Sequence, residues 1–160
     1  MLAAHPLPDN GLQYFVDSID NKLTPNGREV FIMGHGVWNS FDPEVTFQWL
    51  QQVEDAMKAQ MPAFFEPAGI SVEKFPRLFL TSSAQGKLKP EWTLPVQNNI
   101  RVIKHEEVVG AYVKERGYEH LGLYNLTVQA TSWDGTHGSM ETELTKAMMT
   151  LNWLNMLEPG

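Results

Sequence analysis

The sequence predicts an α/β domain in which helices cover both faces of a short parallel sheet, giving three layers. Short apolar runs alternate along the chain with longer segments whose apolar residues recur every three or four positions. This alternation favours parallel strands joined by crossover helices. Glycine-containing or polar loops follow the apolar runs, at 34–39, 81–86 and 131–138. Because folds of this class bind ligands at the carboxyl ends of their strands, we expect these loops to form the functional site.

In the first half of the chain, helical spacing over 12–23 predicts a helix that ends at a Thr-Pro-Asn-Gly turn. The continuous apolar run 30–33 predicts a strand buried on both faces. An acid, a proline and a second acid at 42–44 are typical of a helix start. This helix should run to Pro62 with one inward face. That face comprises Val45, Trp49, Leu50, Val53, Met57 and Met61.

In the second half, strands are predicted at 78–80 and 121–126. Between them a helix capped at Asn98-Asn99 should end near Gly117. Its inward face comprises Val102, Val109, Tyr112 and Val113, and the segment His105-Glu106-Glu107 is interpreted as a solvated face. A last helix should begin at Ser139. Its inward face comprises Met140, Leu144, Ala147, Met148, Leu151 and Leu154.

Length and charge limit the classes of function. The 160 residues suffice for one domain with its own core, so we treat 1–160 as a single domain. A net charge of −7 argues against binding to nucleic acid or to an anionic membrane. No apolar run approaches a bilayer-spanning length, and we see no signal peptide, so the compartment is left open.

Composition also limits the chemistry. Cysteine is absent, which excludes thiolate catalysis and thiolate metal sites. The histidines lack metal-binding spacing and no nucleotide-binding loop is present, so neither a metal nor a cofactor is expected.

The loop Asp134-Gly135-Thr136-His137 carries the clearest chemistry in the chain. An aspartate can hold a histidine in one tautomer and stabilise its protonated form, as in the last two members of a Ser-His-Asp triad. The alternative is an ordinary Asp-Gly turn beside a surface histidine.

With this loop in place, the chain resembles the SGNH (GDSL-type) esterase and acetylesterase family over residues 12 to 157. Asp134 and His137 match the family's D-x-x-H block, and the Gly34–Asn39 segment is similar to its glycine-and-asparagine block. The resemblance implies a flavodoxin-like fold, with His137 as base and Asp134 as its orienting acid. It implies that Asn39 and Gly36 contribute to the oxyanion hole, and that the substrate is a small ester or an acetylated carbohydrate.

The departure from the family is the missing nucleophile. No Gly-Asp-Ser block is present, and the first two strands of the expected five are absent, so the resemblance covers the C-terminal two-thirds of such a domain. We therefore expect an incomplete domain that is weakly active or inactive alone. Its exposed sheet edge predicts self-association. A non-catalytic binding module derived from the same fold is the alternative.

Other polar and aromatic residues at the strand ends have two interpretations each. Ser82 and Ser83 bind substrate or cap backbone groups, or one of them replaces the nucleophile. His35 lines the cleft or makes loop hydrogen bonds. The tryptophans at 38, 92 and 133 stack on a sugar ring or fill the core. A serine within hydrogen-bond reach of His137 Nε2 would favour the enzyme over the binding module.

Overall fold

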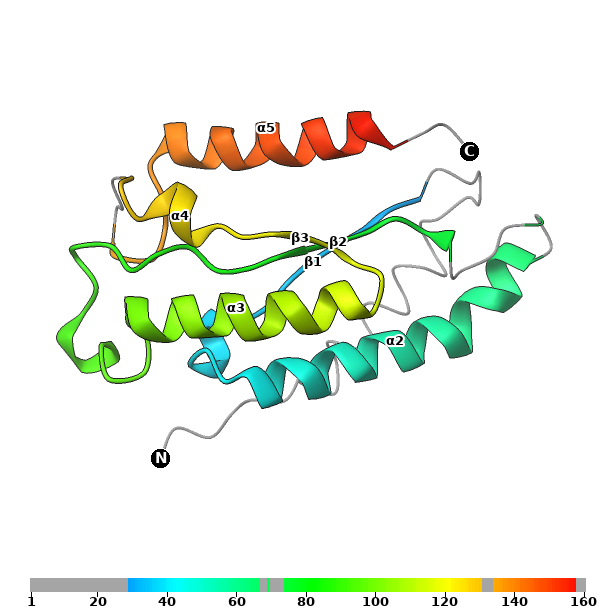
Figure 1. The fold of residues 1–160 in the computed structure, drawn as a ribbon, viewed down its shortest axis with the longest axis horizontal. Helices are drawn as coiled ribbons and strands as arrows, with labels where there is room; N and C mark the ends of the chain where they lie inside the picture. The colour runs from blue at the N-terminus through cyan, green and yellow to red at the C-terminus, as the bar shows by residue number, and fades with distance from the viewer. Residues whose placement is uncertain (1–28, 67–68, 70–73, 131–133, 158–160) are drawn as a thin grey trace.

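The structure is a computed structural model that describes residues 29–66, 69, 74–130 and 134–157. Three parallel strands, β1 (Phe31–Gly34), β2 (Arg77–Leu80) and β3 (Glu119–Leu121), pair in the order β1-β2-β3. Helices α2 (Pro43–Phe65) and α3 (Asn99–Glu115) lie on one side of this sheet and α5 (Met140–Met156) on the other (Figure 1). The predicted α/β class is confirmed. The helix predicted at 12–23 lies outside the described residues.

Shorter elements complete the fold. Two 3-10 turns, Val37–Asn39 and Glu91–Thr93, follow β1 and β2, and a four-residue helix, α4 (Tyr124–Thr127), follows β3. None of the described helices is long and apolar enough to cross a bilayer.

The core lies between the sheet and the layer of α2 and α3. It is built from Leu50, Phe79, Val109, Val113 and Tyr118. The inward face predicted for α3 is confirmed, since its three valines are buried and Tyr112 packs against the core. In α2, the predicted Leu50, Val53, Met57 and Met61 are also buried.

The predicted helix starts are confirmed by their caps, but one predicted end is wrong. The Asn98 side chain accepts a hydrogen bond from Arg101 N at 3.1 Å, and Ser139 Oγ accepts one from Thr142 N at 3.4 Å. Helix α2 continues past Pro62 to Phe65. Proline removes one backbone donor there, but its fixed φ is itself helical, so the last turn can persist.

The strand predicted at 121–126 is wrong over most of its length. Strand β3 ends at Leu121, and the chain then turns into α4. Leu123 N donates to Thr81 Oγ1 at 3.3 Å, and Tyr124 N donates to Glu106 Oε2 at 3.1 Å. Because side chains accept these backbone hydrogens, the ladder ends and a helical turn begins.

Two predictions of burial are also wrong. The run at 30–33 is not buried on both faces, because Ile32 is exposed on the face opposite Phe31 and Met33. The apolar row of α5 points outward, and Leu144 is 55% exposed. The opposite side of α5 faces the protein instead. It carries buried Thr142 and half-buried Lys146, Met149 and Trp153.

Candidate functional site

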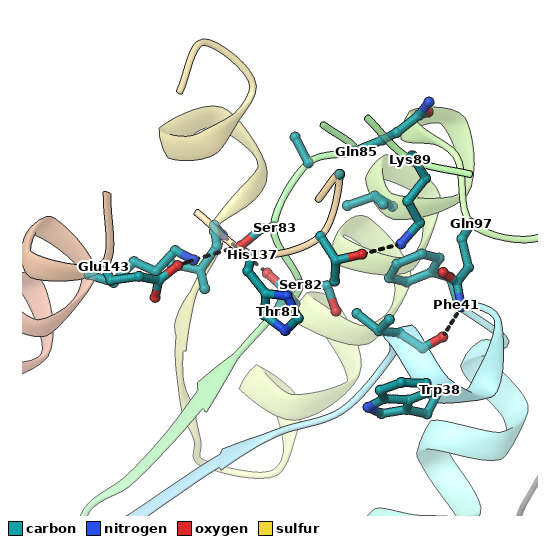
Figure 2. A pocket seen from close by; sticks show the side chains of 17 residues that line it. Trp38, Phe41, Thr81, Ser82, Ser83, Gln85, Lys89, Gln97, His137 and Glu143 are labelled. Atoms are coloured by element: carbon teal, nitrogen blue, oxygen red, sulfur yellow. Dashed lines mark hydrogen bonds and ion pairs between the residues drawn. The ribbon is translucent and has the colours of Figure 1, made fainter. Parts of the chain in front are cut away.

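A pocket of about 390 Å³ lies beyond the carboxyl end of β2 (Figure 2). The segment after β1 contributes Trp38 and Phe41, and the segment after β2 contributes residues 81–85 and Lys89. The loop carrying His137 and the first turns of α5 line it as well, and Gln97, Val102 and Leu123 complete the wall. Parts of all three predicted loops therefore meet in one pocket, although 131–133 lie outside the described residues.

Asp134 and His137 form a hydrogen-bonded pair on the rim. His137 Nδ1 lies 2.7 Å from Asp134 Oδ2, while Asp134 Oδ1 accepts the backbone N–H groups of Thr136 and His137 at 2.9 and 3.0 Å. The hydrogen bonds from His137, backbone first and then ring, hold the pKa of Asp134 well below its usual range. Asp134 is therefore ionised at neutral pH. If His137 Nδ1 carries the proton, Nε2 keeps a lone pair that can accept one.

The pair is open to solvent, with side-chain exposures of 75% for His137 and 57% for Asp134. His137 nevertheless lines the pocket together with Ser82 and Ser83, although among the described residues its hydrogen bonds go to Asp134 and neither serine is bonded to its ring. Figure 2 shows its ring on the side of the pocket where both serines stand.

Gly36 stands directly behind Ser82. Its φ is 149°, which disfavours other residues, and a Cβ on Gly36 would lie 2.7 Å from Ser82 Oγ. Parallel pairing of Gly34 with Leu80 brings the two strand ends together. Gly36 therefore leaves room for the Ser82 hydroxyl rather than lining the pocket itself.

Ser83 has a charged partner. Lys146 Nζ donates to Ser83 Oγ and to Glu143 Oε1, both at 2.8 Å. The hydrogen bond from Lys146 lowers the pKa of Glu143. Lys146 is thus tied to Glu143 by an ion pair while it donates to Ser83.

Gly135 joins the loop of the pair to the loop after β2. A Cβ at Gly135 would collide with the Lys89 backbone, and Gly86 N donates to Gly135 O at 3.0 Å. Lys89 Nζ then donates to Thr136 Oγ1 at 2.6 Å. The close approach that glycine permits fixes Lys89 relative to His137.

Asn39 lies outside the pocket lining and is only 4% exposed. Its Nδ2 is 2.9 Å from Thr46 Oγ1, 3.0 Å from Asp42 O and 3.1 Å from His35 Nδ1. Its Oδ1 accepts Phe41 N at 3.1 Å. In this structure Asn39 shapes the turn that carries Trp38 and Phe41.

His35 and His105 belong to the same buried network. Thr46 Oγ1 lies 3.0 Å from His35 Nδ1 and 2.9 Å from His105 Nε2, and the His35 ring stacks on Trp49. Burial lowers the pKa of each histidine to about 4. The prediction that His105 lies on a solvated face is wrong. Its spacing from Val102 and Val109 places it on the inward face of α3, and this spacing is the sequence pattern from which its burial could be predicted.

Of the three tryptophans predicted to stack on a sugar or fill the core, one lines the pocket. Trp38 lines it and is 87% exposed, and Trp92 is also exposed, whereas Trp133 lies outside the described residues. Within the described part of the chain, no three histidine or carboxylate side chains are grouped so as to hold a metal ion.

The arrangement thus offers an oriented histidine, two pocket serines and two lysines around a solvent-open cavity. Comparison with known proteins does not assign the chain to a family. No family model, no curated protein and no solved structure matches the chain.

Proposed function

We propose that this pocket is the active site of an SGNH-type ester hydrolase acting on small acyl esters, with O-acetyl groups on carbohydrate as the favoured substrate. The observation that carries the proposal is the 2.7 Å pair between His137 Nδ1 and Asp134 Oδ2 in a pocket that also holds Ser82. A flavodoxin-like form of the sheet belongs to the same proposal.

In the proposed reaction, Ser82 Oγ attacks the ester carbonyl carbon and its proton passes to His137 Nε2. The tetrahedral intermediate then expels the alcohol, which takes that proton from His137. Water attacks the acylated serine by the same route, and the carboxylic acid leaves. Asp134, ionised throughout, stabilises the imidazolium that forms in each half of the reaction.

The neighbours of Ser82 have supporting roles in this proposal. Gly36 makes room for the serine hydroxyl, and Asn39 holds the turn in front of it. This differs from the oxyanion role that the family resemblance assigns to both, because Asn39 Nδ2 lies within hydrogen-bond distance of Asp42 O, Thr46 Oγ1 and His35 Nδ1, which occupy its two hydrogens. The exposed indole of Trp38 suits stacking against a sugar ring.

A fluorophosphonate probe, which reacts only with activated serines, tests the proposal. We expect an adduct at Ser82, located by mass spectrometry, that His137→Ala abolishes. Asp134→Asn should slow labelling by orders of magnitude, because the histidine loses its orienting charge. Ser83→Ala is the matched control and should still be labelled.

Two results would contradict the proposal for this chain: no adduct on a folded sample, or an adduct that is insensitive to His137→Ala. The first would favour a second candidate, a non-catalytic interaction module. The specific observation behind that candidate is the exposed apolar row of α5, which comprises Met140, Leu144, Met148 and Leu151. A second copy of this chain is the proposed occupant of this row, which is a different surface from the sheet edge through which the sequence predicts self-association.

A further inference from the structure

The charge of the pocket differs from that of the whole protein. The chain carries a net charge of −7, yet the charged residues that line the pocket are Lys89, Lys146 and Glu143, with His137 beside them. Glu143 binds Lys146 directly at 2.8 Å. Lys89 is therefore the cation whose charge is least compensated within the lining.

Lys89 is also partly removed from water. Desolvation lowers its pKa, and the negative charge of Asp134 only partly opposes this effect. Its ammonium bonds the neutral hydroxyl of Thr136, and no carboxylate in the described part of the chain lies within ion-pair distance of it. A half-buried ammonium with a neutral partner is costly, and an anionic ligand would offset that cost.

The position of Lys89 is fixed rather than incidental. Gly135 allows the Lys89 backbone to pack directly against the loop of Asp134 and His137. Figure 2 shows the Lys89 side chain entering the pocket on the same side as Phe41, with Trp38 at the edge nearby. A ligand ring stacked on Trp38 would thus share the cavity with the Lys89 ammonium.

We propose that the pocket binds an anionic sugar, with Lys89 holding the carboxylate or phosphate group and Trp38 stacking on the ring. That this sugar is the acylated substrate rests on the proposed esterase function, whereas the binding of the anion does not. Lys89 is in this sense a specificity residue, and it takes no part in proton transfer.

Calorimetric titration of the full chain with three probes tests the proposal: glucuronate, glucose 6-phosphate and glucose. At least one anionic sugar should bind roughly tenfold tighter than glucose, the size expected for a charge-assisted hydrogen bond. High salt should reduce this preference. Tight binding of glucuronate alone identifies a carboxylate ligand, and tight binding of glucose 6-phosphate alone identifies a phosphate. Either result supports the proposal.

Matched variants separate the role of Lys89 from general electrostatics. Lys89→Met should abolish the preference for the anion, and Lys89→Arg should retain most of it. Lys87→Met is the control, because Lys87 is exposed two residues away and lies outside the lining. Trp38→Ala should weaken the binding of glucose and of the anionic sugars by similar factors.

The proposal is overturned if glucose binds as tightly as both anions, if no sugar binds, or if Lys89→Met behaves like Lys87→Met. None of these results depends on turnover. Fluorophosphonate labelling without anion binding would contradict the anionic-sugar proposal and leave the esterase proposal intact. Anion binding without labelling would contradict the esterase proposal and leave the anionic-sugar proposal intact.

Discussion

Helices α3 and α5 have 17 residues each and both begin at a side-chain cap, but α3 turns a mainly apolar face toward the protein and α5 turns a mixed one. Helix α3 buries Val102, Val109 and Val113 beneath the sheet. Helix α5 buries Thr142, half-buries Lys146, Met149 and Trp153, and leaves most of its predicted apolar row in solvent. In α3 the buried face contributes to the core, whereas in α5 the inward polar side contributes Glu143 and Lys146 to the pocket.

The two helices therefore contribute to different properties of the molecule. Substitutions on the inward face of α3 should change the free energy of unfolding. Those on the outward face of α5 should leave it almost unchanged, because no apolar surface is buried there. The buried histidine of α3 gives the sharpest form of this contrast, since it adds a dependence on pH.

The largest expected effect is acid destabilisation through His105. Burial lowers its pKa to about 4, so between pH 6.5 and 4 the unfolded chain binds a proton that the folded chain does not. The contribution of His105 to stability is therefore complete above pH 6.5 and declines as the pH falls toward 4. At 1.36 kcal/mol per pH unit, this decline amounts to roughly 3 kcal/mol for a side chain that is 1% exposed.

Urea unfolding at neutral and acidic pH measures this decline. His105→Gln should lose less stability on acidification than the wild type. Some loss should remain in this variant, because burial also lowers the pKa of His35. His137→Gln is the control, because that side chain is largely exposed, and it should behave as the wild type. Equal losses in His105→Gln and the wild type would contradict the assignment. Asp42, Thr46 and Phe41 surround the ring and are unchanged in every variant.

A matched pair of alanine substitutions gives the next effect. Val109→Ala removes two buried carbons from the core, which costs about 1.6 kcal/mol at ~0.8 kcal/mol per group, with a further cavity contribution. Leu144→Ala removes a larger side chain from the exposed row of α5, so the change should stay within about 0.5 kcal/mol. Urea midpoints measure both. A loss at Leu144 as large as that at Val109 would mean that the row is covered in solution.

The sequence predicted the α3 half of this contrast and not the α5 half, for a physical reason. Apolar spacing identifies a face that favours burial, but it does not say whether another part of the chain covers that face. In α3 the predicted face is the buried one, whereas in α5 the chain packs through Thr142 and Lys146 instead.

Some contacts of the candidate site join residues that are close in the sequence, and others join residues that are far apart. The Asp134–His137 pair is local, three residues apart, and its hydrogen bonds follow from the loop. The contacts of Lys89 with Thr136, 47 residues away, and of Lys146 with Ser83, 63 residues away, depend on packing between distant segments. Single-sequence patterns carry no signal for such contacts, so the cations of the pocket were not predicted.

The smallest expected difference concerns the two caps. Asn98→Ala should cost about 1 kcal/mol, because α3 has no acidic residue in its first turn to replace the lost acceptor. Ser139→Ala should cost less than half of that. Its bond to Thr142 N is long, at 3.4 Å, and Glu141 and Glu143 already stabilise the positive end of α5. Urea midpoints of the two variants measure the difference, and Asn98→Asp, which keeps an acceptor, should stay near the wild type. A larger loss of stability in Ser139→Ala than in Asn98→Ala would contradict this prediction. It would mean that α5 depends on its N-terminal cap, as an isolated helix does, more than on its contacts with the rest of the protein.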